Sequence, residues 1–299
     1  MKIAIIGNSH FGPILTKQLS EFDKKNSYTF YNTNADIVDK IKFALSLPII
    51  DVVYSISATI SGGGALNLAL KFNKKIVQHF IGSDVLTAIE DYKSCNTSKK
   101  LIRKSRYLCE VSWIQNELQK INISAEMFSF MVCDLRMEPI PFRTFSVLTY
   151  IGKGKENFYG VNDFIKLANH FPDVEFKIAG IEFYKGLPIN VKCLGWINMK
   201  EELQKTVVFI RNAEHDGLGF SVVEALSLGR VVLRNYRFPY VNYFENSDDM
   251  IEYIADAKRQ FEEGSLEINY SEIEFVKKEY SKSHVLGNLI KILTGGSDK

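Results

Sequence analysis

The sequence predicts an α/β protein made of two Rossmann-like domains, each a doubly wound parallel sheet, which face each other across a cleft. Apolar, strand-like runs alternate with helical patterns along the whole chain, as is typical of parallel sheets covered by helices on both faces. The alternation restarts after a proline-marked segment, "MEPIPFRTF". A chain of 299 residues, 46% of them apolar, also exceeds the usual size of one domain by about a factor of two.

The first half of the chain contains six strand-like runs separated by amphipathic patterns. The expected strands are residues 2–7, 28–32, 51–57, 75–82, 107–112 and 125–130. The expected helices are residues 13–25, 36–46, 65–73 and 113–121. Each of these helical segments has apolar residues three and four positions apart, which is the period of an amphipathic helix. We predict a first domain over residues 1–140.

The second half repeats this organisation. The expected strands are residues 146–152, 174–180, 191–197, 207–212 and 231–236, and the expected helices are 161–171, 200–205 and 221–229. Pro139 and Pro141 force extended backbone before them, as in an interdomain linker. Residues 270–293 indicate two consecutive helices. We predict a second domain over residues 141–283, with a last helix at about 284–295 that packs back on the first domain.

Composition and charge exclude several classes of partner and site. The net charge of +2 argues against nucleic acid as the main partner. The cysteines lack the spacing of a zinc site or a disulfide framework, and we expect reduced, mostly buried thiols at Cys95, Cys109, Cys133 and Cys193. No apolar run is long enough to cross a bilayer and no signal sequence is recognisable, so we expect a cytoplasmic protein.

The basic residues concentrate in one segment, "KKLIRKSR", from Lys99 to Arg106. Leu101 and Ile102 lie among its five cations, and a segment of this kind can bind the anionic headgroups of a membrane surface. The alternative interpretation is a solvated helix face.

Functional residues are expected in the loops that follow strands, because ligands of open parallel sheets bind outside the carboxyl ends of the strands. The loop "IGNSHFGP" places Gly7 and Gly12 around the start of a helix, whose free amides favour an anionic group; a bare strand-to-helix connection is the alternative. Three consecutive glycines, Gly62–Gly64, predict close approach by a ligand or by the other domain.

A third loop, "HFIGSDV", follows the strand at 75–82 and brings His79 to its carboxyl end. A hydrogen-bonded core histidine is the alternative, because His79 alternates with apolar neighbours. Ser83 or Asp84 has the character of a helix N-cap.

The strongest signal is "RNAEHDGLGFSVVEALSLGR", residues 211–230, in which a loop after a strand leads into a helix. Gly217 and Gly219 would let the backbone pass close to a ligand at the helix N-terminus, where positive partial charge is available to a phosphate. Asp216 before the turn and Glu224 inside the helix could both reach a polyhydroxyl ligand beside that phosphate. The alternative is a turn aspartate and an exposed helix glutamate.

The segment "DGLGFSVVEALSLGRVV" resembles the acid-x7-Glu signature of retaining GT-B glycosyltransferases of family four (glycosyl transferases group 1). Supporting segments follow in the family's order, from the N-terminal glycine loop through "HFIGSDV", "VSWIQNELQKINI" and "VLTYIGKG" to the closing helices. The resemblance implies two Rossmann-like domains, with a nucleotide sugar held mainly by the second and the acceptor held by the first. The acceptor-side candidates are Gly7, His10, Gly12, Gly62 and Gly63.

The resemblance also implies roles for individual residues. Glu224 would accept hydrogen bonds from the nucleotide ribose, Asp216 would contact donor-sugar hydroxyls, and His79 would contact the donor sugar near the reacting carbon. Glu214 is a rival for the role of Asp216, since the family's first acid is usually glutamate. The amides expected beside the diphosphate belong to Gly217, Leu218, Gly219 and Phe220.

The cations beside the diphosphate depart from the family's pattern. Lys153, after Gly152, stands where an arginine is expected, and Tyr159–Gly160 stands where Lys-Gly is common. Lys155 and Arg211 are the candidates to supply the missing cation.

These residues imply a hexosyltransferase of polysaccharide biosynthesis that moves a sugar from a donor such as a UDP- or GDP-sugar to a glycan or lipid-linked acceptor. The resemblance implies retention of anomeric configuration. The chain has no DxD motif, so we expect no metal and no other cofactor: fixed cations would stabilise the departing diphosphate. A nucleotide-sugar epimerase of the same architecture and a non-catalytic nucleotide-sugar binder are the alternatives.

Overall fold

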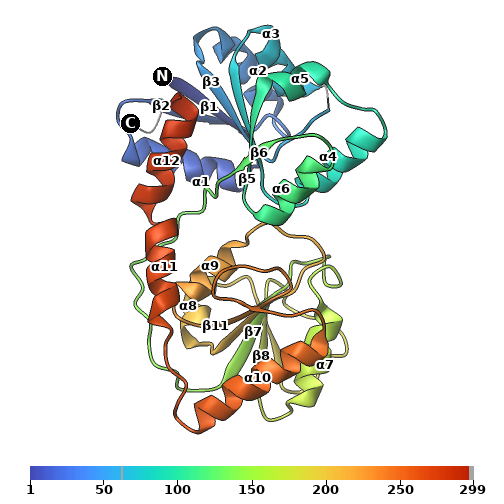
Figure 1. Cartoon of the computed structure of the whole chain (residues 1–299), viewed down its shortest axis with the longest axis vertical. Coiled ribbons are helices and arrows are strands. Elements are labelled where there is room, and N and C mark those ends of the chain that lie inside the picture. Colours follow the sequence, from blue (N-terminus) through green and yellow to red (C-terminus); the bar gives the residue numbers. More distant parts are fainter. Residues whose placement is uncertain (62, 296–299) are drawn as a thin grey trace. The chain divides into compact units, whose positions relative to one another are not determined.

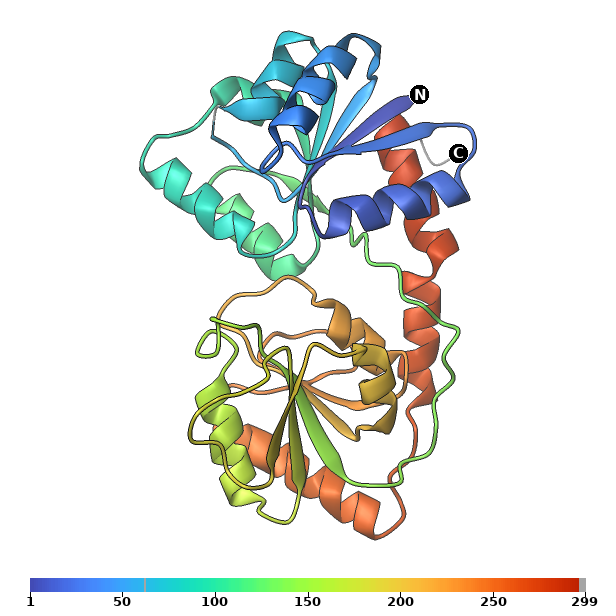
Figure 2. The ribbon, with the colours of Figure 1, turned by 180° about the vertical axis from the view of Figure 1, so that it is seen from behind.

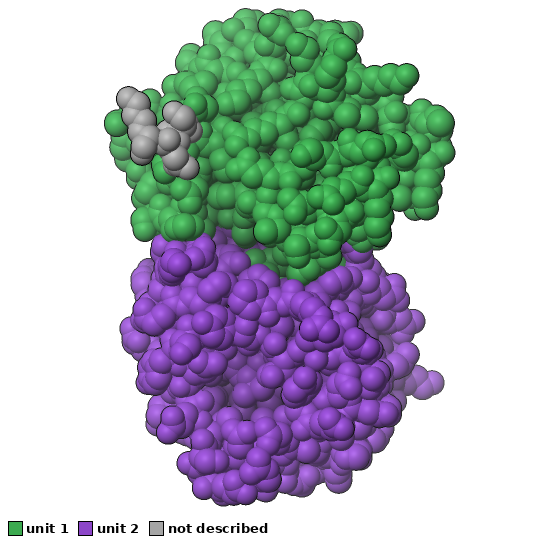
Figure 3. Space-filling model, viewed as in Figure 1, with its two compact units in different colours: residues 1–130, 216–218, 283–299 green, residues 131–215, 219–282 purple. Residues whose placement is uncertain are grey.

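The computed structural model describes residues 1–61 and 63–295, which form two compact units (Figure 3). Unit 1 comprises Met1–Phe130, the short segment Asp216–Leu218, and the C-terminal segment from Ser283. Unit 2 comprises Met131–His215 and Gly219–Lys282. The predicted domains were residues 1–140 and 141–283, so the two divisions differ by ten residues at the first boundary, and Asp216–Leu218 joins unit 1.

Unit 1 is built on a six-stranded, all-parallel sheet with the strand order β2-β1-β3-β4-β5-β6 (Figure 1). Its strands are β1 (Lys2–Gly7), β2 (Ser27–Tyr31), β3 (Val52–Ile56), β4 (Lys75–Phe80), β5 (Ser105–Cys109) and β6 (Ala125–Met127). The side chains of β3 are buried on both faces, which agrees with its nearly continuous apolar sequence. All six predicted strands form; β5 begins two residues early because Ser105 already pairs with Ile76 of β4.

Helices cover the sheet of unit 1. They are α1 (Phe11–Phe22), α2 (Ile37–Ser46), the 3₁₀ turn η1 (Leu47–Ile49), α3 (Gly64–Lys71), α4 (Asp84–Lys93), α5 (Lys99–Lys104), α6 (Ser112–Gln119) and α12 (Lys282–Thr294). The carboxyl end of α12 is held by two basic side chains: Lys75 Nζ donates to the carbonyls of Ile292 and Leu293, and Arg106 donates to that of Ile292. Cations at a helix C-terminus satisfy carbonyls that have no partner inside the helix.

Unit 2 has a second six-stranded parallel sheet, with the order β12-β11-β10-β7-β8-β9 (Figure 2). Its strands are β7 (Ser146–Tyr150), β8 (Glu175–Ala179), β9 (Val191–Gly195), β10 (Val208–Arg211), β11 (Val231–Arg234) and β12 (Asn242–Tyr243). Its helices are α7 (Val161–His170), α8 (Met199–Lys205), α9 (Phe220–Leu226), α10 (Ser247–Glu262) and α11 (Tyr270–Tyr280). The strand order reverses between β7 and β10, which makes this pair the topological switch point of the sheet.

The sequence reasoning missed α4, β12 and α10. The start of α10 explains the adjacent carboxylates Asp248 and Asp249 as a helix-start feature. Asn246 and Asp249 form a reciprocal capping box, and exposed Asp248 pairs with Lys166 at 3.1 Å.

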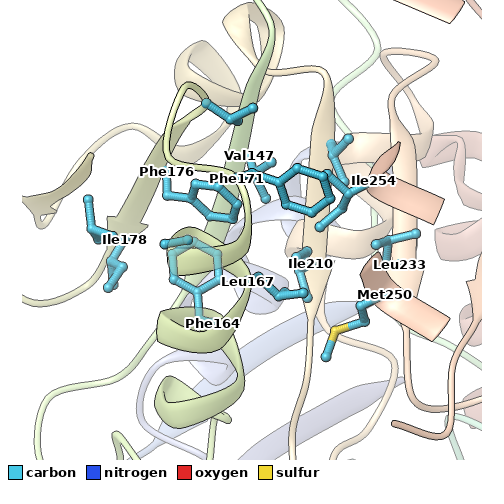
Figure 4. Packing of buried hydrophobic residues seen from close by; sticks show 14 of the residues in the cluster. Val147, Phe164, Leu167, Phe171, Phe176, Ile178, Ile210, Leu233, Met250 and Ile254 are labelled. Atoms are coloured by element: carbon cyan, nitrogen blue, oxygen red, sulfur yellow. The ribbon is translucent and has the colours of Figure 1, made fainter. Parts of the chain in front are cut away.

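A single apolar core holds unit 2 together, with Phe164, Phe176, Ile210 and Ile254 among its members (Figure 4). The proline-marked segment predicted as a linker is attached to this unit. Phe145 belongs to the core, and the Arg230 guanidinium donates to the Ile140 carbonyl at 2.8 Å.

All four cysteines are free thiols. Cys95 is exposed, contrary to the expectation of mostly buried thiols, whereas burial raises the pKa of Cys109 to about 12.

Candidate functional site

The switch point of unit 2 lies between β7 and β10, and two loops leave the sheet there. The chain enters one loop after Tyr150 and the other after Arg211, at the carboxyl ends of the two neighbouring strands. In open parallel sheets this is the edge where ligands bind, because loops on either side of the reversal leave a crevice.

Arg211, the last residue of β10, is 7% exposed and lies over two tyrosine rings. Its guanidinium carbon is 4.7 Å from the ring centre of Tyr159 and 5.7 Å from that of Tyr150. Gly160, at the start of α7, has φ +66°, and a Cβ there would lie 2.3 Å from Nδ2 of Asn212. The Tyr-Gly pair that departs from the family's pattern is therefore a packing element: the tyrosine supports Arg211 and the glycine admits Asn212.

Lys153 and Lys155 lie on the tight turn that follows β7. The amide of Lys155 donates to the Gly152 carbonyl, and Gly154 has φ +77°. Lys153 is exposed and makes no ion pair with the part of the chain that the structure describes. Lys155 is also exposed, with Nζ 5.7 Å from the ring centre of Phe158. Three predicted cationic residues, Lys153, Lys155 and Arg211, thus lie on the two loops of one switch point.

Helix α9 carries Glu224 on the side away from its apolar residues. Val222, Val223, Ala225 and Leu226 are buried, whereas Glu224 is half-buried. Burial raises the pKa of the Glu224 carboxyl, Lys200 opposes this effect, and Asp134 adds to it. Sequence reasoning missed Lys200, because a lysine in the first turn of a helix is normally solvated; here it is 8% exposed. Gly219, just before the helix, has φ +78°, which a glycine adopts without strain.

The residues Asp216–Leu218 pack within unit 1. Trp113 Nε1 donates to the Asp216 carbonyl at 2.8 Å, and the Leu218 amide donates to Oε2 of Glu110 at 3.3 Å. A Cβ at Gly217 would lie 2.0 Å from the carbonyl oxygen of Ile81. The close approach that requires glycine here is therefore to the protein backbone, and one of the amides expected beside a diphosphate already has a carboxylate partner. Glu110 follows a strand end, so the rule used for the other loops would have indicated it.

His79, the predicted contact of the donor sugar, is fully buried in unit 1. Its Nδ1 and the Tyr54 hydroxyl are 2.7 Å apart and share a hydrogen bond, and the rings of Phe128 and Phe130 pack against the imidazole. Burial lowers the pKa of His79 to about 3. The structure shows the alternative interpretation, a hydrogen-bonded core histidine, and contact with a sugar stays a prediction.

Acid should destabilise the protein through His79. The unfolded chain binds this proton near pH 6.5 and the folded chain only near pH 3, so the histidine's contribution to stability is complete above pH 6.5 and falls as the pH drops toward 3. We expect a loss of about 2 kcal/mol by pH 5, at about 1.4 kcal/mol per pH unit. Chemical denaturation of wild type and His79→Gln between pH 5 and 7 measures the difference; parallel curves would contradict it. Asp84, whose pKa burial raises to about 6, acts in the opposite direction in both proteins.

The acceptor-side candidates divide by their surroundings. Gly7 has φ +99° and Gly12 lies against the ring of Phe30, so both have steric reasons to be glycine. His10 is exposed at the start of α1, and exposed Gly63 has open space around it. Gly62 lies outside the described residues.

Two searches over the described part of the chain found nothing. No helix there is long and apolar enough to span a membrane, and no group of three or more His, Cys, Asp or Glu side chains is placed to hold a metal ion. Metal independence itself stays a prediction.

Comparisons with known proteins rest on structure. No protein-family model and no curated protein matches the sequence. A glycosyltransferase from Rickettsia africae superposes with a TM-score of 0.69 at 12% identity, with 99% of both chains covered. Sucrose-phosphate synthase from Thermosynechococcus elongatus gives a TM-score of 0.72 at 9% identity, covering 99% of this chain and 100% of that one. The chain has the GT-B fold.

A third GT-B structure is TarM from S. aureus in complex with UDP and α-GlcNAc-glycerol, with a TM-score of 0.62 at 14% identity over 85% of this chain. The chain covers 59% of the length of TarM. At these identities the likeness is one of fold. The predicted fold class, two Rossmann-like doubly wound domains of GT-B type, is therefore confirmed.

Proposed function

We propose that this GT-B protein is a metal-independent, retaining hexosyltransferase that moves a sugar from a UDP- or GDP-sugar to a glycan or lipid-linked acceptor. One observation carries the proposal: the switch point of unit 2 gathers Lys153, Lys155 and Arg211 on the loops after β7 and β10. This is the edge of a Rossmann-like sheet where a nucleotide binds. The complex of TarM with UDP supports a nucleotide at the corresponding domain.

The chemistry of sugar transfer fits this arrangement. Breaking the bond between the anomeric carbon and a nucleoside diphosphate leaves negative charge on the departing phosphate. Cations fixed beside that phosphate stabilise the transition state more than the ground state, which is the condition for catalysis. Arg211 is pre-positioned by its two tyrosines, and Lys153 is exposed and able to reach a ligand. The proposal assigns the donor to unit 2 and the acceptor to unit 1.

Thermal denaturation in the presence of UDP- and GDP-sugars tests the proposal. A donor at about 100 times its dissociation constant adds about 2.7 kcal/mol of stability. Incubation with the stabilising donor then separates the functions. Slow release of free sugar supports a transferase, interconversion without cleavage would indicate an epimerase, and binding without either reaction would indicate a non-catalytic binder. The anomeric configuration of a transferred sugar, read by NMR, tests retention.

Replacing Glu224 by alanine should weaken nucleotide binding by about 1.5 to 3 kcal/mol, because a hydrogen bond to a charged acceptor is lost. Calorimetric titration with UDP and GDP measures the change. Glu262→Ala, which removes an exposed carboxylate paired with Lys258, is the matched control and should bind as wild type does. Equal affinity of Glu224→Ala and wild type would remove Glu224 from the site.

A further inference from the structure

Helix α2 of unit 1 exposes an unbroken apolar stripe. Ile37, Ile41 and Leu45 are 72%, 56% and 77% exposed, and they follow one another at intervals of four residues on one side of the helix. Val38 at 53% and Ile49, in η1, at 58% extend the stripe. Scattered exposed apolar residues are ordinary on a protein surface, but a contiguous set indicates an interaction site.

The opposite side of α2 fixes the helix in this orientation. Phe43 and Leu47 lie in the apolar core of unit 1. Asp36 caps the helix by accepting from the amides of Val38 and Asp39, and the Asp39 carboxylate accepts from the amide of Asn32. The stripe is therefore exposed because another apolar face already packs inward.

Basic side chains surround the stripe. Lys40 and Lys42 flank it on its two sides, since successive residues are about 100° apart around a helix. Phe43, Leu70 and Leu101 belong to one core cluster, which places α2, α3 and α5 over the same part of the sheet (Figures 1 and 2). These three helices carry seven lysine and arginine residues and one acidic residue: Lys40, Lys42, Lys71, Lys99, Lys100, Arg103 and Lys104, against Asp39.

The basic segment predicted at Lys99–Arg106 supplies charge to this surface but little apolar area. Leu101 is fully buried, and Arg106 is engaged by Glu126 and by the end of α12. Lys99, Lys100, Arg103 and Lys104 are exposed and form no ion pair with the described residues. The apolar contact must come from α2.

We propose that α2 lies in the interface of an anionic membrane, with Ile37, Ile41 and Leu45 among the acyl chains and the surrounding lysines and arginines at the headgroups. An apolar face bordered by cations is the pattern of an interfacial helix, and lysines extend their charged ends toward the headgroups while their stems lie along apolar surface. A second copy of the chain fits less well, because a twofold contact places a surface against itself and would oppose like charges.

This inference specifies the membrane contact that accompanies a lipid-linked acceptor, but vesicle binding does not depend on the proposed catalysis. Sedimentation with vesicles and sugar transfer are separate measurements, so either can fail alone. The experiment uses the full chain, phosphatidylglycerol–phosphatidylcholine vesicles and pure phosphatidylcholine vesicles.

The decisive variant is Ile41→Ser combined with Leu45→Ser, which removes apolar area from the stripe and leaves every charge in place. Its matched control is Phe183→Ser combined with Ile189→Ser, two residues of unit 2 that are 79% and 101% exposed. We expect wild type and control to sediment with anionic vesicles, and the stripe variant to bind at least about tenfold more weakly at an unchanged melting temperature. Lys40→Glu combined with Lys42→Glu should weaken binding as well, and binding should fall with added salt.

Three results would overturn the inference. The stripe variant could bind as the control does, or wild type could bind neutral vesicles as well as anionic ones. Sedimentation equilibrium could instead show a dimer that the stripe variant dissociates, which would assign the stripe to a second copy. Loss of binding only on replacing Lys99, Lys100 and Arg103 would assign the contact to the basic segment alone.

Discussion

Turnover should fall about a hundredfold when Lys153 is replaced by methionine, a loss of roughly 2.7 kcal/mol of transition-state stabilisation. Methionine keeps most of the side chain's length and removes its charge. Lys153 follows the end of β7 at the switch point, is exposed, and has no ion-pair partner among the described residues, so its charge is available to a departing diphosphate. The same mechanism requires activity to survive chelation, because fixed cations take the place of a metal.

The measurement is turnover with the identified donor, in the presence and absence of excess EDTA. Asp248→Asn is the control: this exposed carboxylate pairs with Lys166 at the start of α10 and should tolerate the change. Abolition of activity by EDTA with rescue by manganese would contradict the metal-free mechanism. A Lys153→Met enzyme within about threefold of wild type would transfer the phosphate role to Lys155 or Arg211.

The second large effect is on stability: Gly7→Ala should cost about 4 kcal/mol. Gly7 ends β1 with φ +99°, and a Cβ there would lie 2.0 Å from the carbonyl oxygen of Ile56. That carbonyl accepts from the amide of Asn8 at 2.8 Å, so relieving the clash disturbs the pairing of β1 with β3. Chemical denaturation measures the loss of unfolding free energy.

Gly63→Ala is the matched control. Gly63 is an exposed loop glycine with extended backbone, and a Cβ there meets no atom within 4 Å. Its stability should change by less than about 0.5 kcal/mol. If both variants were equally stable, the steric account of Gly7 would fail, and a purely ligand-binding reason for this glycine would regain weight.

The sequence alone determined the order of elements and the fold class. Strands buried on both faces, such as β3, must be nearly continuous in apolar residues, and this local signal needs no knowledge of neighbours. The same holds for loops after strands: Lys153 and Arg211 were found because parallel strands deliver their carboxyl ends to one edge of the sheet, and β7 and β10 proved to be adjacent. The short strand β12 was missed because two residues carry no periodic signal.

The tertiary structure decided which surroundings each residue has. Periodicity shows that α2 is amphipathic, but which of its apolar residues face the core depends on the packing of Phe43 and Leu47, and this leaves Ile41 in solvent. His79 is buried because Tyr54 and two phenylalanines, each distant in sequence, surround it. Gly217 is a glycine because of the Ile81 carbonyl. Burial and close approach depend on atoms contributed by remote segments, and a residue's own sequence neighbourhood does not contain them.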